Sequence, residues 1–390
     1  MMKVYGMKIV HICLCGAMTD GLTYQENIIT KYHRRMGLDV TVIASQWAWN
    51  SSGKKVQVEQ TVYINPDGVK MIRLPILIGT VDNRLKKYKG LSRTVESEHP
   101  DILFIHDCQF LDILVLARYA RKHPKVRVYV DNHVDYSNGA HGWLSKNILH
   151  KGLWRYCAKR IEPYTTKFYG VLPARVDFLK ELYNLPAEKC ELLVMGADDE
   201  MVQKAAAPEV RQSLRKKYSI SEEDFLIMTG GKIDAFKTQT LLLMQAVQAI
   251  PDKKVKLIVF GSVIPELKEK VQLLADGNRI QYIGWIQAQE SYQYFAAADL
   301  VVFPGRHSVF WEQVTGQGIP MLVKDWPGMH HVDLGGNVQF LTKDSAEEIQ
   351  EEIERLIHHP EEYRSMKQIA EEKGMKVFSY AVIAKRSIEM

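Results

Sequence analysis

The sequence predicts an α/β protein built of two successive doubly wound, Rossmann-like domains, and three observations support this. Short apolar runs rich in Val and Ile alternate with helix-patterned segments, as in βαβ units on a parallel sheet. The alternation restarts after a loop at 195–200. The length of 390 residues allows two hydrophobic cores, with domains of about 190 residues each.

In the first half, β-branched runs predict strands at 8–14, 39–45, 102–106 and 126–132. Helical spacing predicts helices over 24–36, 109–122 and 143–160, while 46–98 is irregular. His11 interrupts the apolar run near the N-terminus, so we interpret 8–14 as a buried first strand and not as a secretory signal.

In the second half, the same patterns predict strands at 225–230, 255–260, 280–283, 299–303 and 320–323. The intervening segments predict helices over 238–249, 264–275, 289–297 and 309–317. No apolar run approaches the roughly 18 to 20 residues that span a bilayer, so we expect no transmembrane segment. Ligands of open parallel sheets bind beyond the carboxyl ends of the strands, where we look for chemistry.

Cysteine usage and charge bear on the compartment and the partners. Five scattered cysteines, an odd number, favour a reduced, cytoplasmic setting. Residues 1–190 carry 28 Lys and Arg against 17 Asp and Glu, a net charge of +11, which leaves −6 for residues 191–390. Basic clusters lie at 84–93, 118–127 and 151–160. They could be solvated helix faces, a peripheral contact with an anionic inner-membrane face or lipid phosphate, or a nucleic-acid surface, although no nucleic-acid motif accompanies them.

The segment TGGKIDAFK at 229–237 is the strongest local signal for phosphate binding. It follows a predicted strand and precedes a predicted helix. Gly230 and Gly231 would let backbone amides approach phosphate oxygens, and Lys232 and Lys237 would supply two positive charges. The alternative is a tight turn with solvated lysines.

The spacing G-K-I-x-x-x-K in this segment resembles the G-R-L-x-x-x-K-G signature of family-four glycosyltransferases with the GT-B fold. The resemblance implies that Lys232 and Lys237 hold the diphosphate of a nucleotide-sugar donor. Lysine supplies the charge of the family's arginine but not its bidentate fork.

A second stretch, DLVVFPGRHSVFWEQVTGQGIPMLV at 299–323, is similar to the late segment of that family, which carries two glutamates. Counting back from Pro320 places the second glutamate position at Gln313, beside Glu312, and the first at Gly305. The resemblance implies that Glu312 or Gln313 grips the nucleotide ribose. Ser308 and Val309 are further donor contacts, because they precede a predicted helix, and His307 and Arg306 add hydrogen-bond donors for an anionic leaving group. The alternative for Glu312 and Gln313 is a solvated first helical turn.

In the first half, VRVYVDNHVD at 126–135 ends a predicted strand with polar residues. The family often carries a histidine at this strand end, and His133 matches it, with Asp131 and Asp135 nearby. We therefore predict His133 and Asp135 as catalytic groups, His106 and Asp107 being a second pair at the preceding strand end. The alternative is an ordinary loop histidine.

The loop CGAMTDG at 15–21 corresponds to the family's glycine-bearing first loop. We expect a donor contact at Gly16 and acceptor contacts at Asp20, Gly21 and Tyr24. The absence of G-x-G-x-x-G argues against nicotinamide binding. Asp198-Asp199 lacks D-x-D spacing and His330-His331 lacks partners at ligand spacing, so no metal and no cofactor are expected.

The resemblance implies two Rossmann-like domains facing across a cleft. They are an acceptor-side domain over 1–190, a nucleotide-sugar domain over 191–375, and a C-terminal helix over 376–390 that crosses back to the first domain. It further implies retaining transfer of a sugar to an acceptor hydroxyl on a glycan or lipid-linked acceptor, in surface-polysaccharide or glycoconjugate assembly. Two alternatives stay open: a nucleotide-sugar epimerase of the same fold, and a catalytically silent homologue that binds a partner transferase.

Overall fold

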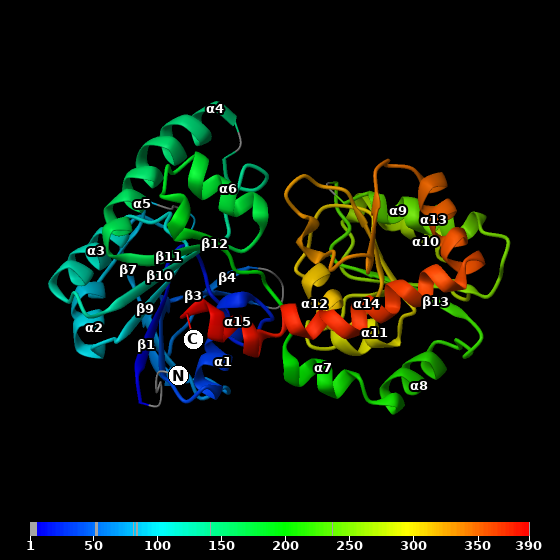
Figure 1. Cartoon of the computed structure of the whole chain (residues 1–390), viewed down its shortest axis with the longest axis horizontal. Helices are drawn as coiled ribbons and strands as arrows, with labels where there is room; N and C mark the ends of the chain where they lie inside the picture. Colours follow the sequence, from blue (N-terminus) through cyan, green and yellow to red (C-terminus); the bar gives the residue numbers. More distant parts are fainter. Residues whose placement is uncertain are drawn as a thin grey trace. The chain divides into compact units, whose positions relative to one another are not determined.

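The chain folds into two compact units in the computed structural model, which describes residues 6–50, 54–80, 82, 85–140, 142–235 and 237–389. The first unit comprises Met1–Val194 with Ile383–Met390, and the second comprises Met195–Val382. The boundary lies slightly after the predicted 190/191, and the returning C-terminal segment begins at Ile383 where we had predicted 376. Figure 1 shows the chain coloured from N- to C-terminus. No helix in the described ranges has both the length and the apolar character needed to cross a bilayer.

The first unit is built on a sheet with the strand order β12-β11-β10-β9-β1-β2-β6-β5, in which only β5 runs antiparallel to its neighbour. Its strands are β1 (Lys8–Cys13), β2 (Asp39–Ser45), β5 (Val62–Ile64), β6 (Lys70–Leu74), β9 (Ile102–His106), β10 (Arg127–Asn132), β11 (Thr165–Gly170) and β12 (Cys190–Leu192). Two small antiparallel pairs are β3 (Trp47–Trp49) with β4 (Lys55–Gln57) and β7 (Ile76–Ile78) with β8 (Lys87–Tyr88).

The helices of the first unit are α1 (Gln25–Arg35), α2 (Leu91–Glu98), α3 (Ile113–Lys122), α4 (Gly142–Leu144), the π-helix η1 (Ser145–Trp154), α5 (Arg155–Ile161) and α6 (Pro173–Glu181), with short 3₁₀ turns η2 (Glu162–Tyr164) and η3 (Ala187–Lys189). The last helix, α15 (Tyr380–Ser387), starts in the second unit and continues into the segment that belongs to the first.

The second unit has an all-parallel sheet with the order β15-β14-β13-β16-β17-β18. Figure 1 shows α9, α10 and α13 on one side of it and α11, α12 and α14 on the other, which is the doubly wound arrangement. The strands are β13 (Phe225–Gly230), β14 (Val255–Phe260), β15 (Ile280–Gly284), β16 (Leu300–Phe303), β17 (Met321–Lys324) and β18 (Val338–Leu341). The helices are α7 (Asp199–Ala205), α8 (Pro208–Lys217), α9 (Gln239–Ala249), α10 (Pro265–Leu274), α11 (Ser291–Ala297), α12 (Phe310–Gly316), α13 (Ala346–His358) and α14 (Pro360–Phe378), with the 3₁₀ turn η4 (His330–Val332).

The predicted α/β class with two parallel-sheet domains is confirmed, and each predicted strand and helix is present to within a few residues. The secondary structure of the irregular stretch 46–98 was underestimated, because its described residues form six short strands and a helix. Strands of two to five residues give too few alternations for a period to be recognised. The predicted helix 143–160 is present, but its centre is π-helical.

The strand order determines which loops meet. In the first sheet β10, β9 and β1 are neighbours, and in the second β14, β13 and β16 are neighbours. Residues that follow these strands are therefore brought to one edge of each sheet, although they are far apart in the sequence.

Candidate active site

In the first unit, a cavity of about 280 Å³ opens where β1, β9 and β10 end. Three predicted site residues line it: His133, Gly16 and Tyr24. The second candidate pair, His106 and Asp107, lines it as well. The other five lining residues were not selected from the sequence: Cys13, Cys15, Ala17, Met18 and Glu26.

Asp131 is the centre of the polar cluster at this cavity, and its side chain is fully buried. One oxygen, Oδ2, lies 2.8 Å from His106 Nδ1 and 3.4 Å from His133 Nε2. The other, Oδ1, accepts a hydrogen bond from the backbone N–H of Asp107 at 3.2 Å. Asp107 in turn accepts from the backbone N–H of His133 at 2.7 Å. The strand ends of β9 and β10 are thereby locked together around one carboxylate.

The carboxylate and the two histidines of this cluster stabilise each other's charged forms. Burial would raise the pKa of Asp131, but His106 and His133 hold it well below its usual range. Burial would lower the pKa of both histidines, but Asp131 raises the pKa of His106 well above 6.5 and raises that of His133. Both imidazoles are therefore biased toward the protonated, hydrogen-bond-donating form.

A row of three buried histidines leads away from the cavity. His106 Nε2 lies 3.0 Å from His11 Nδ1, and His11 Nε2 lies 3.0 Å from His33 Nδ1. His33 Nε2 ends the row at 3.0 Å from the Ala384 carbonyl in the returning C-terminal segment. Burial lowers the pKa of His11 well below 6.5 and that of His33 to about 4, so these two are neutral. One assignment satisfies every contact: a protonated His106 donates to His11, His11 to His33, and His33 to the carbonyl.

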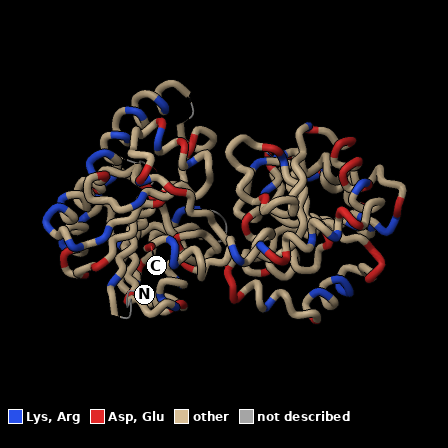
Figure 2. Tube along the Cα trace, in the orientation of Figure 1, with Lys and Arg blue, Asp and Glu red and all other residues tan. Residues whose placement is uncertain are grey.

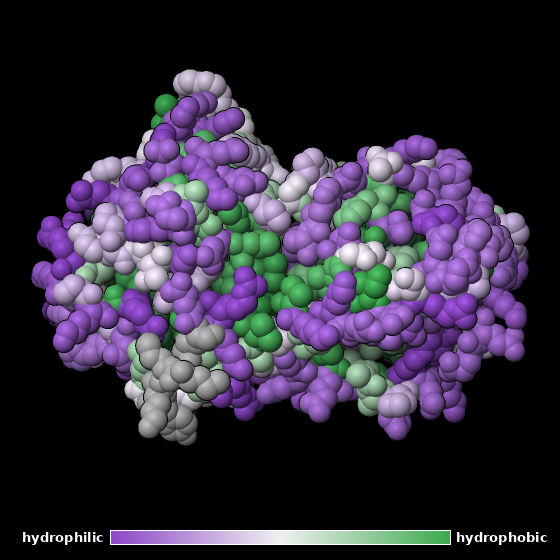
Figure 3. Space-filling view, viewed as in Figure 1, coloured by the Kyte–Doolittle hydropathy of each residue, from purple (hydrophilic) through white to green (hydrophobic). Residues whose placement is uncertain are grey.

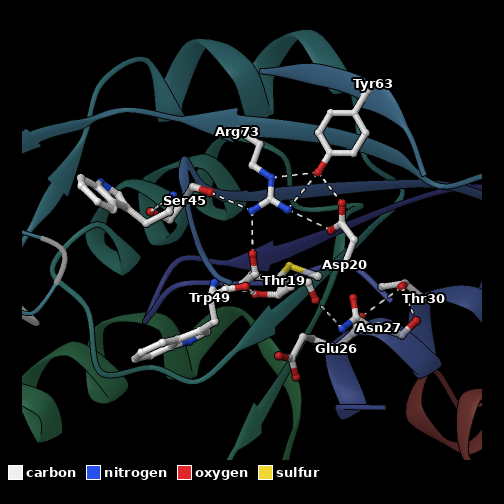
Figure 4. A network of polar contacts seen from close by, with 11 residues as sticks. Thr19, Asp20, Glu26, Asn27, Thr30, Ser45, Trp49, Tyr63 and Arg73 are labelled. Carbon is white, nitrogen blue, oxygen red and sulfur yellow. Dashed lines mark hydrogen bonds and ion pairs between the residues drawn. The ribbon is translucent and has the colours of Figure 1, made fainter. Parts of the chain in front are cut away.

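Asp20 is placed differently from our prediction. It does not line the cavity but pairs with buried Arg73, whose Nη2 lies 2.9 Å from Asp20 Oδ1, and its other oxygen accepts from the Tyr63 hydroxyl (Figure 4). Gly21 does not line the cavity either; its φ of +74° is a turn conformation that favours glycine. The acceptor roles predicted for Asp20 and Gly21 therefore gain no support from their positions.

The side chain of Asp135, which we predicted to be catalytic, is buried and bonded to residues that hold the loop after β10. It is 2% exposed, accepts from Arg175 Nε at 3.1 Å, and accepts from the backbone N–H of Ser137 at 2.6 Å. Both oxygens are occupied, so we assign Asp135 to stabilising the loop after β10. The carboxylate that contacts the two cavity histidines is Asp131, noted above only as a neighbour of His133, while Asp107 and Glu26 are the carboxylates that line the cavity.

In the second unit, the two glycines after β13 have different roles. A Cβ on Gly230 would lie 2.1 Å from the Phe260 ring, so this glycine allows β13 and β14 to pack. Gly231 has φ of +126° and open space where its Cβ would be. Only Gly231 therefore has the free approach that a phosphate contact requires.

The two predicted lysines differ as well. Lys232 is exposed and lies 3.6 Å from Asp234. Lys237 is half-buried, and burial lowers its pKa, with the charge of Arg306 acting in the same direction and that of Asp234 opposing it. Lys237 and Arg306 are thus close enough to repel, and they lie after neighbouring strands β13 and β16. This is a positive site that an anion would stabilise. Phe236 of the same loop lies outside the described residues.

Glu312 is completely buried, and its Oε1 lies 2.8 Å from both His307 Nε2 and His331 Nε2. These histidines hold the pKa of Glu312 far below its usual range against the effect of burial. Its Oε2 has no partner among the described residues and is closed to solvent. Ribose contact by Glu312 stays a prediction, and these contacts favour an indirect role through His307. We had found no partner for His331, and the fold supplies one in Glu312.

The remaining predicted donor contacts lie around the start of α12. Gln313 is 3% exposed and donates to Ser291 Oγ at 2.9 Å, so it serves the packing of α12 on α11. Ser308 and Val309 are partly exposed immediately before the helix. Their donor contacts stay predictions.

Among the described residues, two groups have the composition of a metal site: His106, Asp131 and His133 in the first unit, and His307, Glu312 and His331 in the second. Their ligand-type atoms lie within 4.8 Å of one another. In each group the carboxylate already contacts both histidines, but in the second Glu312 Oε2 and His331 Nδ1 have no partner among the described residues. The absence of a metal stays a prediction.

Residues 224–359 match the family Glycosyl transferases group 1. The chain is 20% identical over 233 residues to mannosylfructose-phosphate synthase of Agrobacterium fabrum, covering 56% of this chain and 51% of that protein. It is 22% identical over 242 residues to alpha-monoglucosyldiacylglycerol synthase of Streptococcus pneumoniae, covering 60% and 54% respectively. The chain thus spans about half the length of these curated relatives.

The fold is shared with solved structures over nearly the whole chain. HepE from Anabaena, solved in complex with UDP, superposes with a TM-score of 0.71 at 15% identity, covering 98% of this chain and 99% of that one. The likeness establishes the GT-B fold, two Rossmann-like domains.

Proposed function

We propose that this chain is a metal-independent glycosyltransferase that uses a nucleotide-diphosphate sugar. It has the GT-B fold, and residues 224–359 of its second unit match the family Glycosyl transferases group 1. The observation that carries the proposal is the open backbone of Gly231 beside Lys237, a half-buried cation whose pKa is lowered by burial and further by the charge of Arg306, with Asp234 opposing. A diphosphate would stabilise the charged form of Lys237, and two cations with backbone amides can neutralise the diphosphate without a metal ion.

In the reaction we propose, an acceptor hydroxyl bonds to the anomeric carbon while the bond from that carbon to the diphosphate breaks. The bonding electrons leave with the nucleoside diphosphate, and a diphosphate oxygen takes the hydroxyl proton. Lys237 and Arg306 stabilise the developing charge, and His133 donates a hydrogen bond to the reacting sugar or phosphate. The family resemblance favours retention of anomeric configuration.

The acceptor belongs to the same proposal. A glycan or lipid-linked acceptor, in surface-polysaccharide or glycoconjugate assembly, fits the family resemblance. A cytoplasmic enzyme in peripheral contact with an anionic membrane fits the net charge of +11 on residues 1–190.

The test is thermal stabilisation of the purified chain by nucleoside diphosphates and their sugars, followed by assay of sugar transfer or donor hydrolysis. We expect stabilisation by at least one nucleoside diphosphate, lost in Lys237→Ala and retained in Lys254→Ala. Lys254 is a matched control, since it is exposed and lies 2.7 Å from Glu223. Activity should survive chelation by EDTA.

Other outcomes would replace the proposal. Conversion of the donor sugar without an acceptor would indicate the epimerase. Binding without turnover of any donor would indicate the silent homologue. No stabilisation by any nucleotide would contradict a donor site at Lys237.

A further inference from the structure

A helical rod in the first unit carries exposed apolar side chains. The rod consists of α4, η1 and α5 and runs without interruption from Gly142 to Ile161 (Figure 1). Its inner side is anchored by Trp154, which is 1% exposed, and by His150, whose Nδ1 lies 2.8 Å from the Tyr183 hydroxyl. The rod is therefore firmly packed on the unit along one side, and its other side is available to a partner.

The outer side presents Trp143 and Leu144, each 69% exposed, Ile148, 55% exposed, and Leu149, 39% exposed. Figure 3 shows hydrophobic surface at the end of the rod that carries α4, among hydrophilic atoms. A π-helix has about 4.4 residues per turn, so side chains four or five positions apart lie on one face. Leu144, Ile148 and Leu149 meet this spacing, and Tyr156, 53% exposed, continues the line two turns later. Single exposed apolar residues are ordinary, but a continuous stripe indicates an interaction surface.

Basic residues form a second line along the rod, on a different face from the apolar stripe. Lys146, Lys151 and Arg155 follow at intervals of five and four, which places them on a parallel line along the rod. Figure 2 shows Lys and Arg concentrated on the helices of this part of the first unit. An apolar face with a tryptophan at its end and a second face that carries Lys and Arg is the pattern of a helix lying in a membrane interface.

A basic cavity lies at the base of the same rod. It has a volume of about 250 Å³ and lies between α3 and α5. Arg118, Arg121, Lys159 and Arg160 line it with Tyr156 and Tyr164, and no acidic residue is among its lining. Of these four cations, only Lys159 has a carboxylate partner in the described ranges, Glu162 at 3.5 Å. Four cations with so little compensation fit a phosphate group.

We propose that the rod docks the first unit on an anionic bilayer, with the stripe from Trp143 to Leu149 in the headgroup region and the cavity between α3 and α5 holding lipid phosphate. The apolar stripe alone would suit any apolar partner, but the basic line on the same rod and the basic cavity at its base favour an anionic surface. This inference rests on the proposed function in one respect. Docking would bring the enzyme to lipid-linked acceptors only if the chain is a glycosyltransferase.

The test uses the full chain with phosphatidylcholine vesicles, with and without phosphatidylglycerol. We expect co-sedimentation only with phosphatidylglycerol, weakening steeply with salt. Trp143→Ser/Leu144→Ser should reduce partitioning by about tenfold or more, because two interfacial anchors are lost. Arg118→Gln/Arg121→Gln should reduce it and flatten its salt dependence. The controls are Leu273→Ser, a residue 76% exposed on α10 of the second unit, and Lys268→Gln on the same helix, which should bind as the original chain does.

Brominated lipids locate the contact. They should quench tryptophan fluorescence in the original chain, and the quenching should fall in Trp143→Phe while partitioning is retained. Nucleotide stabilisation should be the same in all these variants, which separates failure of docking from failure of the proposed function. Docking is overturned if the chain ignores anionic vesicles at low salt, if the rod variants bind as well as the controls, or if gel filtration shows that the stripe joins two copies of the chain.

Discussion

The polar groups at the sheet edges of the two units differ in how their positive charge is stabilised. In the first unit, His106 and His133 surround Asp131, and each charge is balanced inside the cluster. In the second, burial lowers the pKa of Lys237, and the nearby charges of Asp234 and Arg306 act on it in opposite directions. A carboxylate between two histidines holds protons in place, whereas a half-buried lysine with a lowered pKa would be stabilised by an added anion. The difference fits the proposed roles, which are positioning and proton control at the first edge and diphosphate binding at the second.

Removing His133 should have the largest effect and should fall on turnover. We expect His133→Ala to lower turnover by about 10²-fold or more, because one hydrogen-bond donor to the reacting groups is lost. Nucleotide affinity should stay close to normal, since the diphosphate cations lie in the second unit. Measuring melting temperature, affinity and turnover on one preparation separates this from a structural role. A stable, fully active variant would remove His133 from the site.

Removing Lys237 or Lys232 of the second unit should mainly lower the affinity for nucleoside diphosphate, in contrast to the loss of turnover expected for His133→Ala. Lys237→Ala should weaken nucleoside-diphosphate binding by roughly 10- to 100-fold, equal to about 1.5 to 3 kcal/mol for a charge-assisted contact. Lys232→Ala should weaken it less, because Lys232 is 61% exposed and already lies near Asp234. Calorimetric titration of both variants measures the difference. Equal losses would mean that Lys232 also contacts the diphosphate, and no loss in either would move the donor site elsewhere.

Glu312 provides a finer comparison, because its contacts mirror those of Asp131. Glu312→Gln should weaken nucleotide binding by about tenfold, through looser positioning of His307. Gln313→Ala should instead lower the melting temperature with little change in affinity, since it loses the bond to Ser291. If Gln313→Ala alone lowers affinity, the ribose is held at the position that the family spacing indicates.

The smallest effect should appear in the pH dependence of stability. The folded pKa of His133 lies above its unfolded value of 6.5, so its stabilisation is complete below pH 6.5 and is lost as pH rises through the folded pKa. The pKa of Asp131 is lowered from 3.8, so its stabilisation is present above pH 3.8 and is lost at lower pH. Urea unfolding of the original chain should therefore show a decline above pH 6.5 that is shallower in His133→Gln. Parallel curves would show that His133 is not coupled to Asp131.

Much of the site follows from local sequence. Periodicity located β1, β9, β10, β13 and β16, and in open parallel sheets the residues after such strands lie at the ligand edge. His133 and Gly16 at the cavity, and Gly231 and Lys237 after β13, were selected because they follow such strands, whereas Tyr24 was selected from the family resemblance. Their roles stay predictions.

What the sequence could not provide were partners distant along the chain. His11 could be recognised only as a polar interruption of an apolar run, but the fold places it between His33 and His106, 22 and 95 residues away. Asp135 matched a catalytic pattern, yet Arg175 and Ser137 occupy it, and Asp20 is held by Arg73. The physical reason is that periodicity and capping act over a few turns of the chain. These contacts depend instead on the order of the strands in the sheet, which decides the side chains that become neighbours and the carboxylate that pairs with each buried cation.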